Sequence, residues 1–76
     1  MARVETTEVL AEMVANVMTL AVGVGDRVVV GDTLLLLESM KMEIPVLAET
    51  EGAVVAVKVT VGDVVQEGDV LLVLSP

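Results

Sequence analysis

The 76-residue sequence contains no cysteine, no histidine and no aromatic residue, and these absences exclude several kinds of site. Without cysteine and histidine, the chain has no disulfide, no thiol nucleophile, no histidine general base and no zinc site of the usual kind. Unpaired bases cannot stack on aromatic rings here, and the net charge of −8 repels phosphate backbones. The carboxylates are dispersed and lack the spacing of a calcium loop. We therefore expect no nucleic-acid partner, no metal and no catalysis by the chain itself.

Long apolar runs are also missing. The longest stretch without a charged residue covers residues 13–25, which is shorter than a membrane span and is interrupted by Asn16 and Thr19. Glu5 lies where a signal peptide would begin its apolar region. We expect a cytoplasmic protein that does not contact membranes and is monomeric when free, kept in solution by its acidity.

A chain of this length forms one small domain, whose core must come from Val, Leu, Ile, Ala and Met. We expect a flexible lead-in over residues 1–7 and a single domain over residues 8–76. Residues 8–17 are ambiguous, because Thr7 could cap a helix that has Leu10, Met13, Val14 and Val17 on one face. The next run, residues 17–22, favours a β-strand and is closed by a glycine-rich turn.

An internal repeat indicates the architecture. Residues 24–37 align without a gap on residues 61–74, at a constant offset (61 − 24 = 37). The identical pairs are Val24/Val61, Gly25/Gly62, Asp26/Asp63, Val28/Val65, Gly31/Gly68, Asp32/Asp69, Leu34/Leu71, Leu35/Leu72 and Leu37/Leu74. Short strands separated by Gly-Asp turns, present in two copies, predict a small all-β sandwich or barrel whose two halves pack face to face around a common core.

The repeat decides the structure of the central segment. Residues 34–43 have high helix propensity, but their counterpart, residues 71–74, lies in a valine-rich run, so both copies are predicted to be strands. Beyond them, Met42, Ile44, Val46 and Ala48 alternate with residues that include Glu43, Pro45 and Glu49, the period of two expected of a half-buried strand. Pro45 must then direct its missing N–H donor away from the neighbouring strand.

These two strands predict a hairpin with Met40 and Lys41 as its loop residues. In that register Leu37 faces Ile44, Leu35 faces Val46, and Glu38 faces Glu43 as a like-charge pair that requires solvent. Lys41 then lies at an exposed tip. Because the offset of 37 maps this tip onto the chain ends, we expect the tip and the termini to lie at opposite ends of the molecule.

The predicted tip contains no Gly, Asn or Asp, the residues that tight hairpin loops prefer. We infer that the identity of the side chains at the tip matters more for function than a turn conformation free of strain. The simpler interpretations are that Lys41 is an ordinary solvated lysine and that its two methionine neighbours only pack at the tip.

The run Glu38-Ser39-Met40-Lys41-Met42, the Gly-Asp turns and Gly52 resemble the biotinyl domain of biotin-dependent carboxylases, within the biotinyl/lipoyl-attachment family. The resemblance covers residues 10–74 and is greatest to the small free-standing biotinylated proteins of actinobacteria, which are biotin carboxyl carrier-like. It implies a barrel-sandwich hybrid, a flattened barrel of two four-stranded antiparallel sheets with a pseudo-twofold axis. It also implies that Lys41 carries biotin through an amide bond.

The same resemblance implies a non-catalytic carrier. Biotin on Lys41 would move a carboxyl group between the biotin carboxylase and carboxyltransferase sites of partner proteins, with an acyl-CoA carboxylase expected. A biotin protein ligase would recognise the tip, mainly through Met40 and Met42, with secondary contacts to Ser39, Glu38 and Glu43.

The chain departs from the family pattern at two places. Residues 11–15 lack the Pro and Gly that the family often has there, and Glu49 follows Ala48 where the family often has Pro. Two other functions remain open: a lipoyl carrier, whose lysine usually follows Asp, and an unmodified structural or interaction module.

Overall fold

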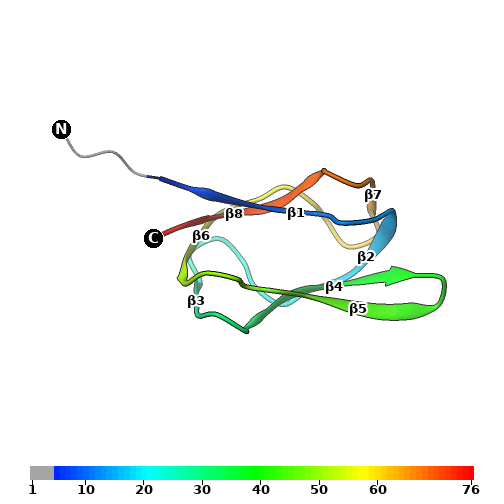
Figure 1. Cartoon of the computed structure of the whole chain (residues 1–76), viewed down its shortest axis with the longest axis horizontal. Coiled ribbons are helices and arrows are strands. Elements are labelled where there is room, and N and C mark those ends of the chain that lie inside the picture. Colours follow the sequence, from blue (N-terminus) through cyan, green and yellow to red (C-terminus); the bar gives the residue numbers. More distant parts are fainter. Residues whose placement is uncertain (1–4) are drawn as a thin grey trace.

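The computed structural model describes residues 5–76, which form eight β-strands and no helix (Figure 1). The strands are β1 (Thr7–Leu10), β2 (Ala15–Leu20), β3 (Arg27–Val28), β4 (Thr33–Ser39), β5 (Met42–Leu47), β6 (Gly52–Val57), β7 (Val64–Val65) and β8 (Val70–Ser75). They make two four-stranded antiparallel sheets, in the orders β1-β8-β6-β3 and β5-β4-β2-β7. The predicted all-β architecture is confirmed. A helix long and apolar enough to cross a bilayer does not occur in the described range.

The two sheets are copies of one another through the internal repeat. The pairing of Thr7 in β1 with Leu74 in β8 repeats the pairing of Ile44 in β5 with Leu37 in β4, 37 residues apart in each strand. The chain ends therefore occupy the place that the β4–β5 turn occupies in the other half. Figure 1 shows that turn at one end of the molecule, with the C-terminus and the beginning of β1 at the other, as predicted.

Four turns built on Gly-Asp explain why that dipeptide recurs. In each turn the aspartate carboxylate accepts the backbone N–H of the residue three positions earlier, and the preceding glycine has φ between 92° and 99°. At the third turn position, glycine adopts a positive φ without the steric strain that a Cβ would cause. The donor–acceptor pairs and their N···O distances are Gly23–Asp26 (2.9 Å), Val29–Asp32 (2.9 Å), Thr60–Asp63 (2.8 Å) and Gln66–Asp69 (2.8 Å).

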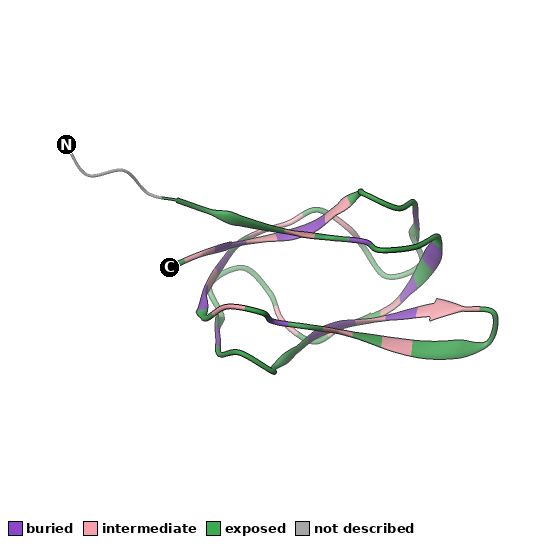
Figure 2. Ribbon diagram, viewed as in Figure 1, coloured by how far each residue is buried: buried purple, intermediate pink, exposed green. Residues whose placement is uncertain are grey.

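The core lies between the two sheets, as the repeat predicted. Its most deeply buried side chains come in equivalent pairs from the two halves: Leu34 with Leu71 and Leu35 with Leu72, all 0% exposed. Figure 2 shows the buried residues on the inner parts of both sheets, while the turns and the hairpin tip are exposed. Each half therefore lacks a closed core without the other.

The helical alternative for residues 8–17 is wrong, because this segment contains β1 and the beginning of β2. After β1, the Ala11 N–H donates to the Asp69 carbonyl and the Gly68 N–H donates to the Ala11 carbonyl, both at 2.8 Å. Pairing with β8 and with the Gly68-Asp69 turn that precedes β8 outweighs the local helix propensity.

The boundary of the predicted lead-in also needs correction by one residue. Thr7 already belongs to β1, where it pairs with Leu74, so the ordered part of the domain begins before residue 8. Residues 1–4 of the predicted lead-in lie outside the described residues.

Gly52 is the glycine that the packing requires most directly. A Cβ at this position would collide with the backbone carbonyl oxygen of Ser75, which the neighbouring strand holds in place. We expect Gly52→Ala to lower the free energy of unfolding by about 1–3 kcal/mol, measured by urea denaturation. Gly23→Ala is the matched control, because nothing lies within 4 Å of the added Cβ. Equal losses in the two variants would contradict the steric explanation.

Candidate attachment site at the β4–β5 turn

The β4–β5 hairpin projects beyond the sheet to which it belongs. Its register pairs Leu35 with Val46, Leu37 with Ile44, Glu38 with Glu43, and Ser39 with Met42, so the predicted register is confirmed. The neighbouring strand β2 pairs with β4 no further than Glu38. The last pair and the two loop residues therefore extend past the supporting strand. Pro45 is accommodated because β5 lies at the edge of its sheet.

The two loop residues adopt a strained but well-defined conformation. Met40 has φ 52° and Lys41 has φ 65°, and they are the only non-glycine residues with positive φ in the described range. Positive φ at both loop positions is the requirement of a type I′ hairpin turn. For residues with a Cβ this conformation costs roughly 1–2 kcal/mol each. The paired strands on either side hold the turn in this shape and fix the direction of both side chains.

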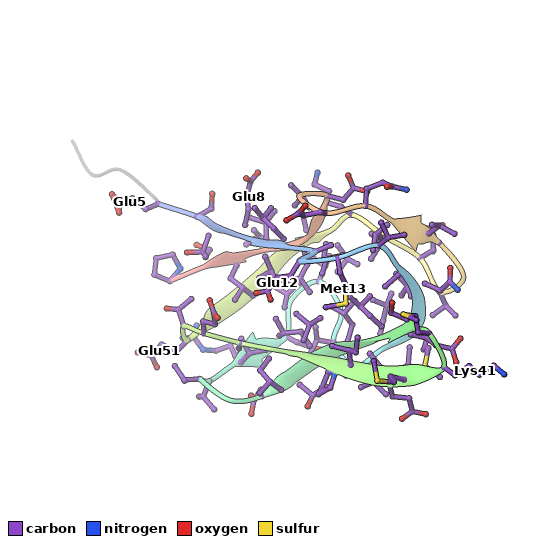
Figure 3. All side chains as sticks on the ribbon, turned by 45° about the vertical axis from the view of Figure 1, so that its right-hand side comes forward. Glu5, Glu8, Glu12, Met13, Lys41 and Glu51 are labelled. Atoms are coloured by element: carbon purple, nitrogen blue, oxygen red, sulfur yellow. The ribbon has the colours of Figure 1, made fainter. Side chains whose placement is uncertain are left out.

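The Lys41 side chain points away from the body of the molecule at the end of the hairpin (Figure 3). Met40 is 88% exposed and Met42 is 58% exposed, so neither methionine contributes substantially to the core. This exposure argues against the interpretation that the two methionines serve only for packing. The site offers one exposed lysine, flanked by two exposed methionines, on a short projecting hairpin.

The other predicted site residues lie at the base of this tip. Glu43 is exposed, whereas Glu38 and Ser39 are half-buried on β4. Glu38 and Glu43 face each other across the hairpin, where solvent must screen their like charges. The structure thus brings together all six residues that the sequence analysis singled out. Among residues 5–76, no group of three or more His, Cys, Asp or Glu side chains could hold a metal ion.

A second apolar feature, not predicted from the sequence, lies at this end of the molecule. The loop between β1 and β2 lies at the same end as the β4–β5 turn (Figure 1), and it exposes Met13 and Val14. The equivalent positions, 37 residues later, carry Thr50 and Glu51, and Figure 3 shows Glu51 at the opposite end. The sequence did contain a signal for this correspondence. Residues 9–12 and 46–49 both read Val-Leu-Ala-Glu, so the repeat extends to them and pairs residues 13–14 with residues 50–51.

Comparison with known proteins gives consistent matches. A family model for biotin and lipoyl attachment, described as biotin-requiring enzyme, matches residues 4–74. The biotinylated protein TB7.3 homolog of Mycolicibacterium smegmatis is 62% identical over 39 residues, and the biotinylated protein TB7.3 of Mycobacterium tuberculosis is 56% identical over 39 residues. Each match covers 51% of this chain and 55% of the relative, so the matched part spans about half the length of these curated relatives.

Two solved structures contain a domain with this fold. A single-chain, multi-domain long-chain acyl-CoA carboxylase matches 92% of this chain with a TM-score of 0.87 and 34% identity, over 7% of its own length. The Kluyveromyces lactis urea carboxylase matches 97% of this chain with a TM-score of 0.87 and 28% identity, over 6% of its own length. In both cases the similarity is to a small part of a much larger enzyme.

Proposed function

This chain belongs to the biotin/lipoyl-attachment family of biotin-requiring enzymes, and we propose that it is a biotin carboxyl carrier with its biotin on Lys41. The observation that carries the proposal is the position of Lys41 between two exposed methionines, at the apex of a projecting hairpin. The relatives named as biotinylated proteins and the similarity to parts of two carboxylases support it. The carrier comprises the single domain predicted over residues 8–76, extended by one residue because its first strand begins at Thr7.

The residues at the tip fit a cofactor that is held by one covalent bond. The carboxyl group of biotin would form an amide with Nζ of Lys41, which removes the positive charge of the side chain. When bound, biotin supplies a ring that accepts and releases a carboxyl group. The chain's own contribution is to present Lys41 on the projecting hairpin, away from the core, so that loading and unloading require no change in the fold. Lys58, the chain's other lysine, follows β6, and its backbone N–H is bonded to the Leu71 carbonyl at 2.9 Å.

The partners follow from this role. A biotin protein ligase would load the tip by contacting Met40 and Met42, with Ser39, Glu38 and Glu43 at the edge of the contact. The loaded carrier would then visit a biotin carboxylase and a carboxyltransferase, as part of an acyl-CoA carboxylase in the cytoplasm. The free carrier is a monomer, and tethering to its partners raises the effective concentration of the carboxyl group at each active site.

A lipoyl carrier is the rival within the same family, because the family model covers both cofactors. Met40 precedes Lys41 where lipoyl carriers usually have Asp, which favours biotin. The discriminating experiment incubates the purified chain with ATP and either biotin plus biotin protein ligase or lipoate plus lipoate ligase. We expect a mass increase only with biotin. Modification by lipoate alone would reverse the assignment, and modification by neither would favour an unmodified interaction module.

Met40→Asn should separate the stability of the turn from its recognition. Asn is much better suited than Met to the first loop position of a type I′ turn, so we expect the free energy of unfolding to rise by about 0.5–1 kcal/mol. The same change removes an apolar contact for the ligase, so biotin transfer should slow by about tenfold. Urea denaturation and timed mass spectrometry measure the two effects. A stabilised variant that is modified at the original rate would show that Met40 is not recognised.

A further inference from the structure

Few side chains among residues 5–76 can be oxidised, and the two most exposed of them lie at one place. Cysteine, histidine, tyrosine and tryptophan are all absent, which leaves methionine sulfur as the readily oxidised group. Of the four methionines in residues 5–76, Met40 is 88% exposed and Met42 is 58% exposed. Met13 is 37% exposed, and Met18 in β2 is half-buried. The two most exposed of these four methionines therefore flank Lys41 directly.

We propose that Met40 and Met42 form a peroxide-sensitive site, and that their oxidation to methionine sulfoxide blocks attachment of the cofactor at Lys41 while leaving the fold intact. This inference rests on the proposed function, because it concerns regulation of the same site.

The chemical step needs only hydrogen peroxide as the oxidant. A lone pair of the methionine sulfur attacks one peroxide oxygen, the O–O bond breaks, and an S–O bond forms. The sulfur loses two electrons, the peroxide is reduced to water, and both peroxide protons leave in that water. The product is a polar, chiral sulfoxide, which a thiol-dependent methionine sulfoxide reductase converts back to the thioether.

The fold should tolerate this change because the tip packs against very little. Met40 lies in the loop, and Met42 is the first residue of an edge strand, paired with Ser39. Neither belongs to the buried core, which is made of Leu, Val and Ala. A sulfoxide oxygen at either position can remain hydrated in the free protein, so little stability is lost.

Oxidation of Met40 and Met42 should, in contrast, weaken the binding of a partner that recognises the tip. A partner that closes over the tip to reach Lys41 must cover the side chains at positions 40 and 42. With methionine it covers flexible apolar groups, which adapt to a surface easily. With sulfoxide it must remove water from a strongly polar oxygen, and this cost opposes binding unless the partner offers a hydrogen bond.

The test treats the purified, unmodified chain with hydrogen peroxide and maps the four methionines of residues 5–76 by peptide mass at successive times. We expect Met40 to be oxidised first, Met42 second, Met13 third and Met18 last. The partly oxidised protein is then given biotin, ATP and biotin protein ligase. We expect biotin transfer to be slower by about tenfold or more in molecules oxidised at positions 40 and 42, and to recover after treatment with methionine sulfoxide reductase. The thermal midpoint should stay within about 2 °C of the untreated value.

Two variants sharpen the comparison. In the double variant Met40→Leu/Met42→Leu, peroxide should leave the rate of biotin transfer unchanged, whatever that rate is. In Met13→Leu, peroxide should slow transfer as in the original chain. Equal oxidation rates at all four positions, or full biotin transfer to protein oxidised at positions 40 and 42, would overturn the inference. Failure of the untreated chain to accept biotin would instead disprove the proposed function, before any oxidant is added, and the inference would fall with it.

Discussion

Lys41→Arg should abolish attachment of biotin completely. Arginine keeps the positive charge and nearly the same length, so the exposed tip and its type I′ turn are expected to persist. A guanidinium is protonated at every accessible pH and is a poor nucleophile, so it cannot take the place of the amine in forming an amide. After incubation with biotin, ATP and biotin protein ligase, the intact mass should remain that of the unmodified chain.

Lys58→Arg is the matched control, because Lys58 is the only other lysine and is also exposed. We expect this variant to accept one biotin at the original rate. The reverse pattern, with attachment lost in Lys58→Arg and kept in Lys41→Arg, would show that biotin is attached to Lys58 and would contradict the assignment to Lys41. Attachment to both lysines in the original chain would show that the hairpin is not recognised as a specific structure.

Leu72→Ala should destabilise the domain more than any change at the tip. Leu72 is 0% exposed on β8 and contributes to the core between the sheets. Truncating a fully buried leucine costs about 2–5 kcal/mol. A domain of this size has a total stability of about 4–11 kcal/mol, at roughly 0.05–0.15 kcal/mol per residue. We therefore expect a large fall in the urea midpoint, with a substantial unfolded fraction if the original stability lies at the lower end.

The internal repeat provides the control for this prediction. Leu35 occupies the equivalent position in the other half and is also 0% exposed, so Leu35→Ala should cost the same to within about 1 kcal/mol. Leu47→Ala should lower the free energy of unfolding by less than about 1 kcal/mol, because Leu47 is 46% exposed. A large difference between the Leu35 and Leu72 variants would mean that the two halves do not share the core equally.

The repeat made most of the fold predictable because its turn chemistry is local. Each Gly-Asp turn is closed by a hydrogen bond that a backbone N–H donates to the carboxylate of the aspartate three residues later, so a short stretch of sequence contains all the information. The turns then define the strands between them. The hairpin register followed for the same reason, because a two-residue loop leaves only one way to pair Leu37 and Ile44.

The first strand could not be predicted with the same security. The apolar residues of segment 8–17 fit a helical period, and the pairing that makes residues 7–10 a strand comes from β8, 60 to 67 residues later in the chain. Periodicity within a segment carries no information about such a distant partner.

At the candidate site, the six residues around Lys41 were identifiable from sequence because they are contiguous. The positive φ of Met40 and Lys41 was not predicted as such; only the absence of Gly and Asn at the tip pointed to a turn in which side chains are kept despite their conformational cost. Exposure of Met13 and Val14 was missed because the two copies diverge after Glu12 and Glu49, where one end of the molecule becomes apolar and the other polar.

The most direct test of the central claim is the intact mass of the chain purified from cells with an active biotin ligase, followed by peptide mapping of the modified residue. We expect one biotin per chain, attached to Lys41 and to no other position. Biotin on Lys58, lipoate on Lys41, or a chain that remains unmodified in the presence of active ligase would contradict it.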